Sequence, residues 1–317
     1  MNTEFTSFAA MLTALPTDAA CREYLEMKRW NGTPVCPHCG TVDAKHYKLN
    51  VKGEFKGMYK CKACKERFTV TVGTMFEGSP ISLRKWFIAT YIFASHKKGI
   101  SSHQLARDLG VTQKTAWFML HRLRTTFTEK DNEMLGGEGV IVETDVTYVG
   151  GKVSNMHKSK RKSMGKGKTP PPMQNKTLVS AYLERGGKIR FDVIDAHETE
   201  KELVKKHIDT DSVLMTDEAH CYKNVGKEFA AHEFVRHTMN EYVRGAAHTN
   251  TIEGAFSLLD RMIIGIYHYA SPKHLQAYCN ESGFRYNTRK ITDKQRFDMA
   301  LCMTAGVKLN YDTLIKK

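Results

Sequence analysis

The chain has 317 residues, room for two or three domains, and its 41% hydrophobic residues are enough for buried cores. Lys and Arg total 48 against 34 Asp and Glu, a formal net charge of +14 that favours association with nucleic acids. No apolar stretch approaches the roughly 20 residues of a membrane helix. Residues 1–16 carry no Lys or Arg, so we expect no signal peptide and predict a cytoplasmic, nucleoid-associated protein.

Four of the eight cysteines form two CxxC pairs separated by 21 residues: Cys36, Cys39, Cys61 and Cys64. Two tight turns can point these four sulfurs at one centre and complete a tetrahedral zinc site, whereas a redox role would explain only one pair. His38 inside the first turn is a competing ligand. Because four protein ligands close the shell, the sequence predicts a structural zinc ribbon in a first domain, residues 1–78.

A pair of short helices is predicted after an apolar helical pattern over residues 83–98. Ser101 or the serine after it can cap a first helix, Gly110 can end it, and Thr112 can cap a second. This is the helix-turn-helix arrangement, whose second helix lies in the major groove of DNA. The sequence therefore predicts a DNA-binding domain over residues 79–130. A plain helical hairpin without DNA contacts is the alternative.

From about residue 136 the pattern alternates between strands and helices. Strands are predicted over residues 139–145, 178–183, 188–194 and 212–217, with a hairpin at Gly186 and Gly187 and a helix over 198–208. Mostly helical sequence follows. This order indicates a mixed sheet covered by helices, in a third domain over residues 131–317.

Three acids occupy positions suited to a metal site: Asp145, Asp217 and Glu253. The two aspartates end predicted buried strands, where clefts open in α/β sheets, and Glu253 begins a helical pattern. Converging carboxylates need a cation, and Mg²⁺ suits them. Two such ions about 3.5–4 Å apart would clamp an in-line phosphoryl displacement. Each acid alone is better explained as a turn former, a cap or a surface charge, so the hypothesis depends on their joint placement.

Basic and polar side chains in two further segments are candidates for contacts with DNA. Within residues 152–168 there are seven Lys or Arg and no acid, just after Asp145. A solvated loop is the alternative reading of that segment. The candidates from this loop and from the second helix of the pair are Gln113, Lys114, Thr115, Arg122, Lys158, Lys160, Arg161 and Lys162.

Short motifs along nearly the whole chain match a known pattern. They are RWNG (29–32), CPHC (36–39), VGTMF (72–76), KGIS (98–101), KTAW (114–117), ETDVTYVGGK (143–152), TDE (216–218), HTNTIEG (248–254) and FRYN (284–287). Together they make the chain similar to the bacterial insertion-sequence transposases of the ISXO type, which are DDE enzymes with an N-terminal zinc ribbon.

This resemblance implies a multidomain α+β protein with a ribonuclease H-like catalytic domain, in which Asp145, Asp217 and Glu253 form the acidic triad. It also implies an enzyme that cuts the ends of its own mobile element and joins the freed 3′ hydroxyl to target DNA. The cofactors would be structural zinc and two catalytic magnesium ions. Chemistry on paired ends implies at least a homodimer on DNA.

Two positions depart from the family pattern. Val146 stands where the family often has an acid, and Asp260 where it often has a lysine that contacts DNA. Two alternatives remain open there: Asp260 repels a phosphate and reduces activity, or Arg261 makes the contact instead. Asn250, on the same helical side as Glu253, is an alternative ligand. Two other functions remain open, a DNA-binding protein that has lost catalysis and a nuclease that hydrolyses DNA without joining it.

Overall fold

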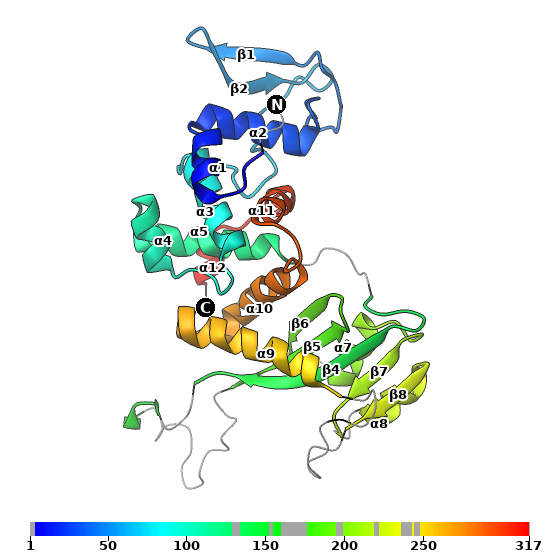
Figure 1. The fold of residues 1–317 in the computed structure, drawn as a ribbon. Helices are drawn as coiled ribbons and strands as arrows, with labels where there is room; N and C mark the ends of the chain where they lie inside the picture. The colour runs from blue at the N-terminus through cyan, green and yellow to red at the C-terminus, as the bar shows by residue number, and fades with distance from the viewer. Residues whose placement is uncertain are drawn as a thin grey trace. The chain divides into compact units, whose positions relative to one another are not determined.

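The computed structural model describes residues 4–128, 134–151, 155–159, 176–194, 199–218, 222–235, 243 and 248–316. It contains two compact units, of which the first joins Met1–Phe127 with Lys290–Lys317 and the second comprises Thr128–Arg289 (Figure 1). In the described part of the chain, no helix is long and apolar enough to cross a membrane.

The first unit contains a small antiparallel sheet and a set of helices. The sheet has the strand order β1 (Tyr47–Val51), β2 (Glu54–Lys60), β3 (Arg67–Phe68). The helices of this unit are α1 (Phe8–Ala14), α2 (Asp18–Trp30), α3 (Leu83–Ser95), α4 (Ser102–Leu109), α5 (Gln113–Thr126), α11 (Asp293–Cys302) and α12 (Tyr311–Ile315).

Aromatic packing fastens the small sheet to the end of α2. Trp30 meets Tyr59 and Phe68 edge to face, with ring centroids 5.7 and 5.9 Å away. Tyr59 and Phe68 stack on each other at 5.5 Å. All three rings are buried, and pairs of this kind add about 0.5–1.5 kcal/mol to the free energy gained from burying their area. The sheet therefore has an apolar base although its other face is mostly exposed.

The two predicted helices of the middle region are confirmed as α4 and α5. The Ser101 hydroxyl accepts from the Gln104 amide and the Thr112 hydroxyl from the Thr115 amide, so both serve as N-caps. Gly110 ends α4 with a φ of 58°, in the left-handed region that favours glycine. Buried leucines and alanines hold the two helices together: Leu105, Ala106, Leu109, Ala116 and Leu120.

The C-terminal segment belongs to the first unit. Phe297 on α11 is fully buried, and its ring contacts Phe87 on α3 at 5.6 Å. Asp298 accepts hydrogen bonds from the Tyr24 hydroxyl at 2.5 Å and the Lys28 ammonium at 2.7 Å. The structure thus differs from the predicted division, which placed Lys290–Lys317 with the third region. Helical periodicity reveals an apolar face but not the surface that will cover it.

The second unit is built on a five-stranded mixed sheet of order β6-β5-β4-β7-β8. The central strand β4 pairs antiparallel with β5 and parallel with β7. The strands are β4 (Ile141–Val149), β5 (Thr177–Glu184), β6 (Ile189–Val193), β7 (Val213–Thr216) and β8 (Ala231–Phe234).

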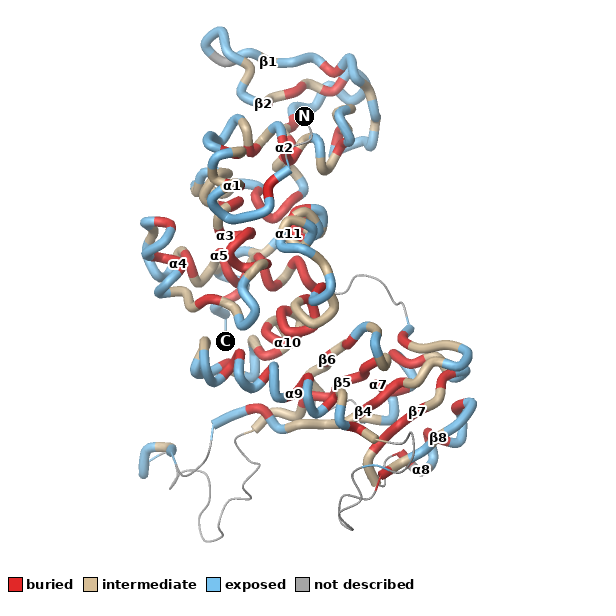
Figure 2. Tube along the Cα trace, viewed as in Figure 1, coloured by how far each residue is buried: buried red, intermediate tan, exposed pale blue. Residues whose placement is uncertain are grey.

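Helices cover both faces of this sheet. One face packs Ala181 and Leu183 against α9 (Asn250–Met262) and α10 (Pro272–Asn287). The other packs Tyr182 and Leu214 against α7 (Glu200–His207) and α8 (Tyr222–Val225). Figure 2 shows that β5 and β7, the strands on either side of β4, are largely buried between these layers.

The predicted strands, the helix before β7 and the hairpin at Gly186 are confirmed. Two features differ from the prediction. β4 continues four residues beyond Asp145 to Val149, and β8 is an additional strand. The sequence of β8, AHEF, is short and polar at two of its four positions, so it carries no strand-like run of apolar residues.

Candidate metal sites and nucleic-acid interface

The four clustered cysteines form a ligand set suited to zinc. The sulfur atoms of Cys36 and Cys64 lie 3.7 Å apart and those of Cys39 and Cys61 lie 3.6 Å apart, and all four lie within 4.8 Å of one another. A tetrahedral zinc ion with bonds of about 2.3 Å sets sulfur atoms about 3.8 Å apart. His38 instead places its Nε2 3.2 Å from the carbonyl oxygen of Arg67, outside this group.

The surroundings of the cysteines favour a bound cation. A hydrogen bond from the Thr41 hydroxyl, followed by one from its amide, lowers the pKa of Cys39 to about 6. Burial raises the pKa of Cys36 instead. Neighbouring thiols cannot all ionise at these distances unless a positive ion compensates their charge. The donor set therefore matches the predicted closed, structural zinc site.

Asp145 lies in β4 and Asp217 directly follows β7, two strands that pair in parallel in the second unit. The parallel ladder pairs Val142 with Leu214 and Glu143 with Met215. The ladder ends at this pair and β7 ends at Thr216, so Asp217 directly follows β7; continued by two residues, the same register would set it next to Asp145. Both side chains are half-buried, and the Asp145 carboxylate accepts from the Val146 amide at 2.7 Å.

Glu253 approaches the same face of the sheet from α9. Asp145 pairs with Ala181 across the β4–β5 ladder, and Ala181 belongs to the core that α9 covers. Glu253 lies in the first turn of α9, where its carboxylate accepts from the Thr249 hydroxyl at 3.2 Å. The three predicted acids thus come from two neighbouring strands and from the helix over them (Figure 1).

The three carboxylates are nevertheless not gathered into a ligand set. Among the residues that the structure describes, the four cysteines form a group of possible metal ligands with donor atoms within 4.8 Å, and the three acids do not. Carboxylates that converge without a cation repel one another. In the described structure the three acids therefore do not share a compact ligand arrangement of the kind that the cysteines form.

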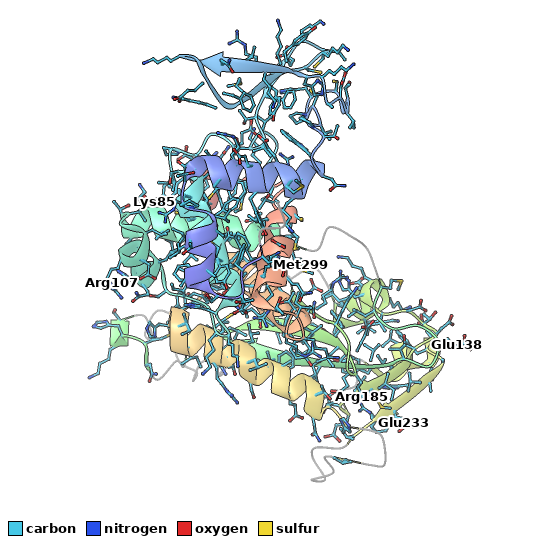
Figure 3. All side chains as sticks on the ribbon, turned by 45° about the horizontal axis from the view of Figure 1, so that its top comes forward. Lys85, Arg107, Glu138, Arg185, Glu233 and Met299 are labelled. Atoms are coloured by element: carbon cyan, nitrogen blue, oxygen red, sulfur yellow. The ribbon has the colours of Figure 1, made fainter. Side chains whose placement is uncertain are left out.

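A buried ion pair beside these acids was not singled out from the sequence. Glu143 is fully buried, and its Oε1 accepts from the Arg185 Nε at 2.6 Å. Arg185 follows β5 and lies at the start of α9 (Figure 3). One feature of the sequence could have indicated this ion pair. Glu143 is a charged residue inside an apolar strand, two positions before Asp145.

The start of α5 carries the exposed polar side chains that the sequence assigned to DNA. Gln113 is exposed, and its amide donates to the Ser102 hydroxyl at 2.8 Å. Lys114 is exposed, with its ammonium 4.5 Å from the Tyr311 ring centroid. Thr115 is half-buried and hydrogen-bonded to the N-cap threonine, Thr112.

Arg122, a further candidate for DNA contact, is half-buried, and its guanidinium contacts two other segments of the first unit. It donates to the carbonyl oxygen of Leu309 at 3.0 Å and to that of Met75 at 2.8 Å. Burial lowers its pKa. The helical pattern of the sequence could not show that the C-terminal segment would cover this part of α5. The structure therefore shows Arg122 packing within the first unit, and its contact with DNA stays a prediction.

The remaining candidate basic residues are partly described. Lys158 and Arg261 are exposed, while Lys160, Arg161 and Lys162 lie outside the described residues. At Asp260, desolvation raises the pKa and the charge of Lys176 lowers it. The positive charge of Lys176 therefore partly offsets the negative charge of Asp260, the residue at the position where the family often has a lysine.

Comparison with known proteins identifies the family of the chain. The family model described as ISXO2-like transposase domain matches residues 134–287, and the one described as transposase zinc-ribbon domain matches residues 16–67. The chain belongs to the ISXO2-like DDE transposases with an N-terminal zinc ribbon. The first match covers most of the second unit, and the second match contains all four clustered cysteines.

The transposase is also similar to a protein of the transposable element ISH50 from Halobacterium salinarum. The two are 26% identical over 244 residues, which cover 74% of this chain and 79% of the relative. Among solved structures, the Mos1 strand transfer complex matches 66% of this chain and 74% of that chain at 12% identity, with a TM-score of 0.23. The Mos1 paired-end complex with the left transposon end matches 63% and 74% at 12% identity, with a TM-score of 0.20. TM-scores this low carry no argument about the fold.

Proposed function

We propose that this transposase cuts and joins DNA with a metal site formed by Asp145, Asp217 and Glu253. The observation that supports the proposal is the parallel pairing of β4 and β7, whose register, continued by two residues, would set the two aspartates next to each other on the face of the sheet that the helix bearing Glu253 covers. The five-stranded mixed sheet supports the assignment to a ribonuclease H-like fold. Family membership supports the reaction class.

The three acids would act as oxygen ligands. Mg²⁺ bound to them would supply the positive charge that stabilises phosphoryl transfer and activates first water and then a DNA 3′ hydroxyl. Asp145 and Asp217 would hold the ion from the rigid sheet. Glu253, which is exposed at the start of α9, is the ligand whose side chain must turn toward the other two.

The first unit would hold the DNA. Residues 45–67 contain seven Lys and one Arg against two Glu, and all but Lys60 of these basic side chains are exposed. The four cysteines would fold this basic ribbon around zinc. The exposed start of α5, with Gln113 and Lys114, would enter the major groove as in a helix-turn-helix. The DNA partners would be the element ends and the target, engaged by at least two copies of the chain.

The deciding experiment measures cleavage and joining of DNA that carries the ends of the element. Purified protein with Mg²⁺ should produce nicked and then joined strands. Asp145→Asn should lower the rate on the order of a thousandfold, because several kcal/mol of charge stabilisation is lost. Binding of the end DNA should persist. Glu138→Gln, at an exposed acid of the same unit (Figure 3), is the matched control and should keep full activity.

The products separate this proposal from the two other functions. Nicked strands without joined products would indicate a nuclease. Tight, specific binding of the ends without any metal-dependent cleavage would indicate a DNA-binding protein that has lost catalysis. Equal rates for the wild type and Asp145→Asn would remove Asp145 from the reaction.

A further inference from the structure

Glu143 is a buried carboxylate that bridges β4 and α9. It is 0% exposed. Its Oε1 accepts from the Arg185 Nε at 2.6 Å, and its Oε2 accepts from the backbone amide of Ile252 at 2.9 Å. The two oxygens of one side chain therefore contact the residue after β5 and the first turn of α9.

The hydrogen bond to Ile252 takes the place of an ordinary helix cap. Thr249, the N-cap residue of α9, makes no side-chain capping bond. The first amides of a helix have no partner within the helix, and negative charge at this end is favourable. Glu143 satisfies one of these amides from the neighbouring strand. It thereby anchors the start of α9 to β4 rather than only stabilising the helix itself.

Arg185 completes the anchor on the other side. Its terminal nitrogen donates to the carbonyl oxygen of His248 at 2.8 Å, and its backbone amide donates to the carbonyl oxygen of Ile141 at 3.0 Å. The His248 ring nitrogen Nδ1 lies 3.4 Å from Glu143 Oε1. One guanidinium and one carboxylate thus hold the chain just before α9 and its first turn against the central strand.

We propose that Glu143, paired with Arg185, is a positioning residue that fixes the start of α9, and with it the backbone of Glu253, relative to the strand that bears Asp145. Glu143 precedes Asp145 by two residues and so lies on the same face of β4, while its partner Ile252 directly precedes Glu253. Any shift of α9 along β4 must break the bonds at Glu143. This inference rests on the proposed metal site and adds two residues that do not themselves contact metal or DNA.

A second buried ion pair provides the matched control. Glu281 is also 0% exposed, and its carboxylate accepts from Arg285 at 2.6 Å and from the Tyr267 hydroxyl at 2.6 Å. Glu281 and Arg285 both belong to α10, one turn apart. Glu143→Gln and Glu281→Gln therefore each remove one buried charge from a pair in the same unit. Only Glu143→Gln acts on the junction between β4 and α9.

The test compares these two variants in the full chain by hydrogen exchange and by metal dependence. Glu143→Gln should speed exchange of the amides at the start of α9 about tenfold or more. It should also raise the magnesium concentration for half-maximal strand cleavage about tenfold. Glu281→Gln should leave both quantities within about twofold of the wild type, even with an equal fall in melting temperature. Arg185→Lys is the second variant and should shift both quantities in the same direction as Glu143→Gln.

Equal shifts in metal dependence for the Glu143 and Glu281 variants would reduce Glu143 to a stability role and overturn the inference. The inference would also be overturned if hydrogen exchange at the start of α9 were unchanged in Glu143→Gln. If that variant does not fold, unchanged exchange in Arg185→Lys would overturn it. Failure of the proposed function has a different signature, since the wild type would then show no metal-dependent cleavage while the exchange comparison would still report on the anchor.

Discussion

The guanidinium of Arg122 donates to the backbone carbonyl oxygen of Leu309 across 3.0 Å, which joins α5 to the C-terminal segment. A second bond from Arg122 to the Met75 carbonyl oxygen adds the loop before α3 to the same contact. Lys114, two turns earlier on α5, remains exposed beside the Tyr311 ring. Two basic residues of one helix therefore differ in their surroundings, since Arg122 is bound to two backbone carbonyl oxygens and Lys114 lies over an aromatic ring.

Lys114→Ala should weaken DNA binding and reduce its dependence on salt. A lysine that neutralises one phosphate releases about one counterion, so the slope of log affinity against log salt should fall by about one. Fluorescence anisotropy with labelled end DNA over a salt series measures this slope. An unchanged affinity and slope would remove the start of α5 from the DNA interface.

Arg122→Ala should destabilise the first unit while leaving the salt slope of DNA binding as in the wild type. The substitution leaves two backbone carbonyl oxygens without their charged donor, at a cost of roughly 2 kcal/mol in the free energy of unfolding. Urea denaturation of the full chain measures this loss. Arg122→Lys should recover little of it, because an ammonium cannot reach both carbonyl oxygens in the guanidinium's geometry. A stable Arg122→Ala protein with a lower salt slope would return Arg122 to the DNA interface.

Removing one zinc ligand should empty the metal site and unfold the ribbon. The wild type should hold about one zinc per chain, and Cys36→Ser should hold almost none, because three sulfur ligands no longer close the tetrahedral shell. Elemental analysis of the purified proteins measures the zinc. Cys302→Ser changes an exposed cysteine outside the ribbon and serves as the control. Wild-type protein free of zinc would contradict the prediction.

Features that depend on neighbours in sequence could be predicted. The spacing of Cys36 and Cys39 already defines half of a metal site, and Gly110 with Thr112 defines the end of one helix and the start of the next. Short apolar runs, with the hairpin signal at Gly186 and Gly187, located four of the five strands in the second unit. In each case the physical cause acts over a few residues, so the sequence displays it directly.

Features that depend on distant partners could not be predicted. The bond from Glu143 to Ile252 spans 109 positions, and the bond from Arg122 to Leu309 spans 187. The charges of Glu143 and Arg122 show that their side chains can form hydrogen bonds. The local sequence does not specify which distant residue will be the partner. The acids were predicted as a triad by joint placement and resemblance. The parallel pairing of β4 with β7, on which their joint placement depends, required the structure.

Glu200 gives the second unit a stability that depends on pH. Burial, with a smaller contribution from the charge of Asp145, raises the pKa of the Glu200 carboxyl from 4.5 to about 7, although hydrogen bonds from Ser180, Tyr222 and Thr144 oppose this shift. Between these two pH values the folded protein holds a proton that the unfolded chain has released. The free energy of unfolding should therefore fall as the pH rises through this window and stay low above it.

Glu200→Gln should remove this loss, because the neutral amide resembles the protonated carboxyl and can still accept from Ser180. Thermal or urea unfolding at pH 5 and at pH 8 measures the effect. At pH 8 the variant should exceed the wild type by up to about 3 kcal/mol, the free energy that corresponds to the shift, and at pH 5 the two should be nearly equal. Glu202→Gln is the control on the same helix. Hydrogen bonds from the Thr199 amide and hydroxyl lower the pKa of Glu202, so its contribution to stability is lost only in acid. A wild type that is equally stable at pH 5 and pH 8 would show that Glu200 titrates normally.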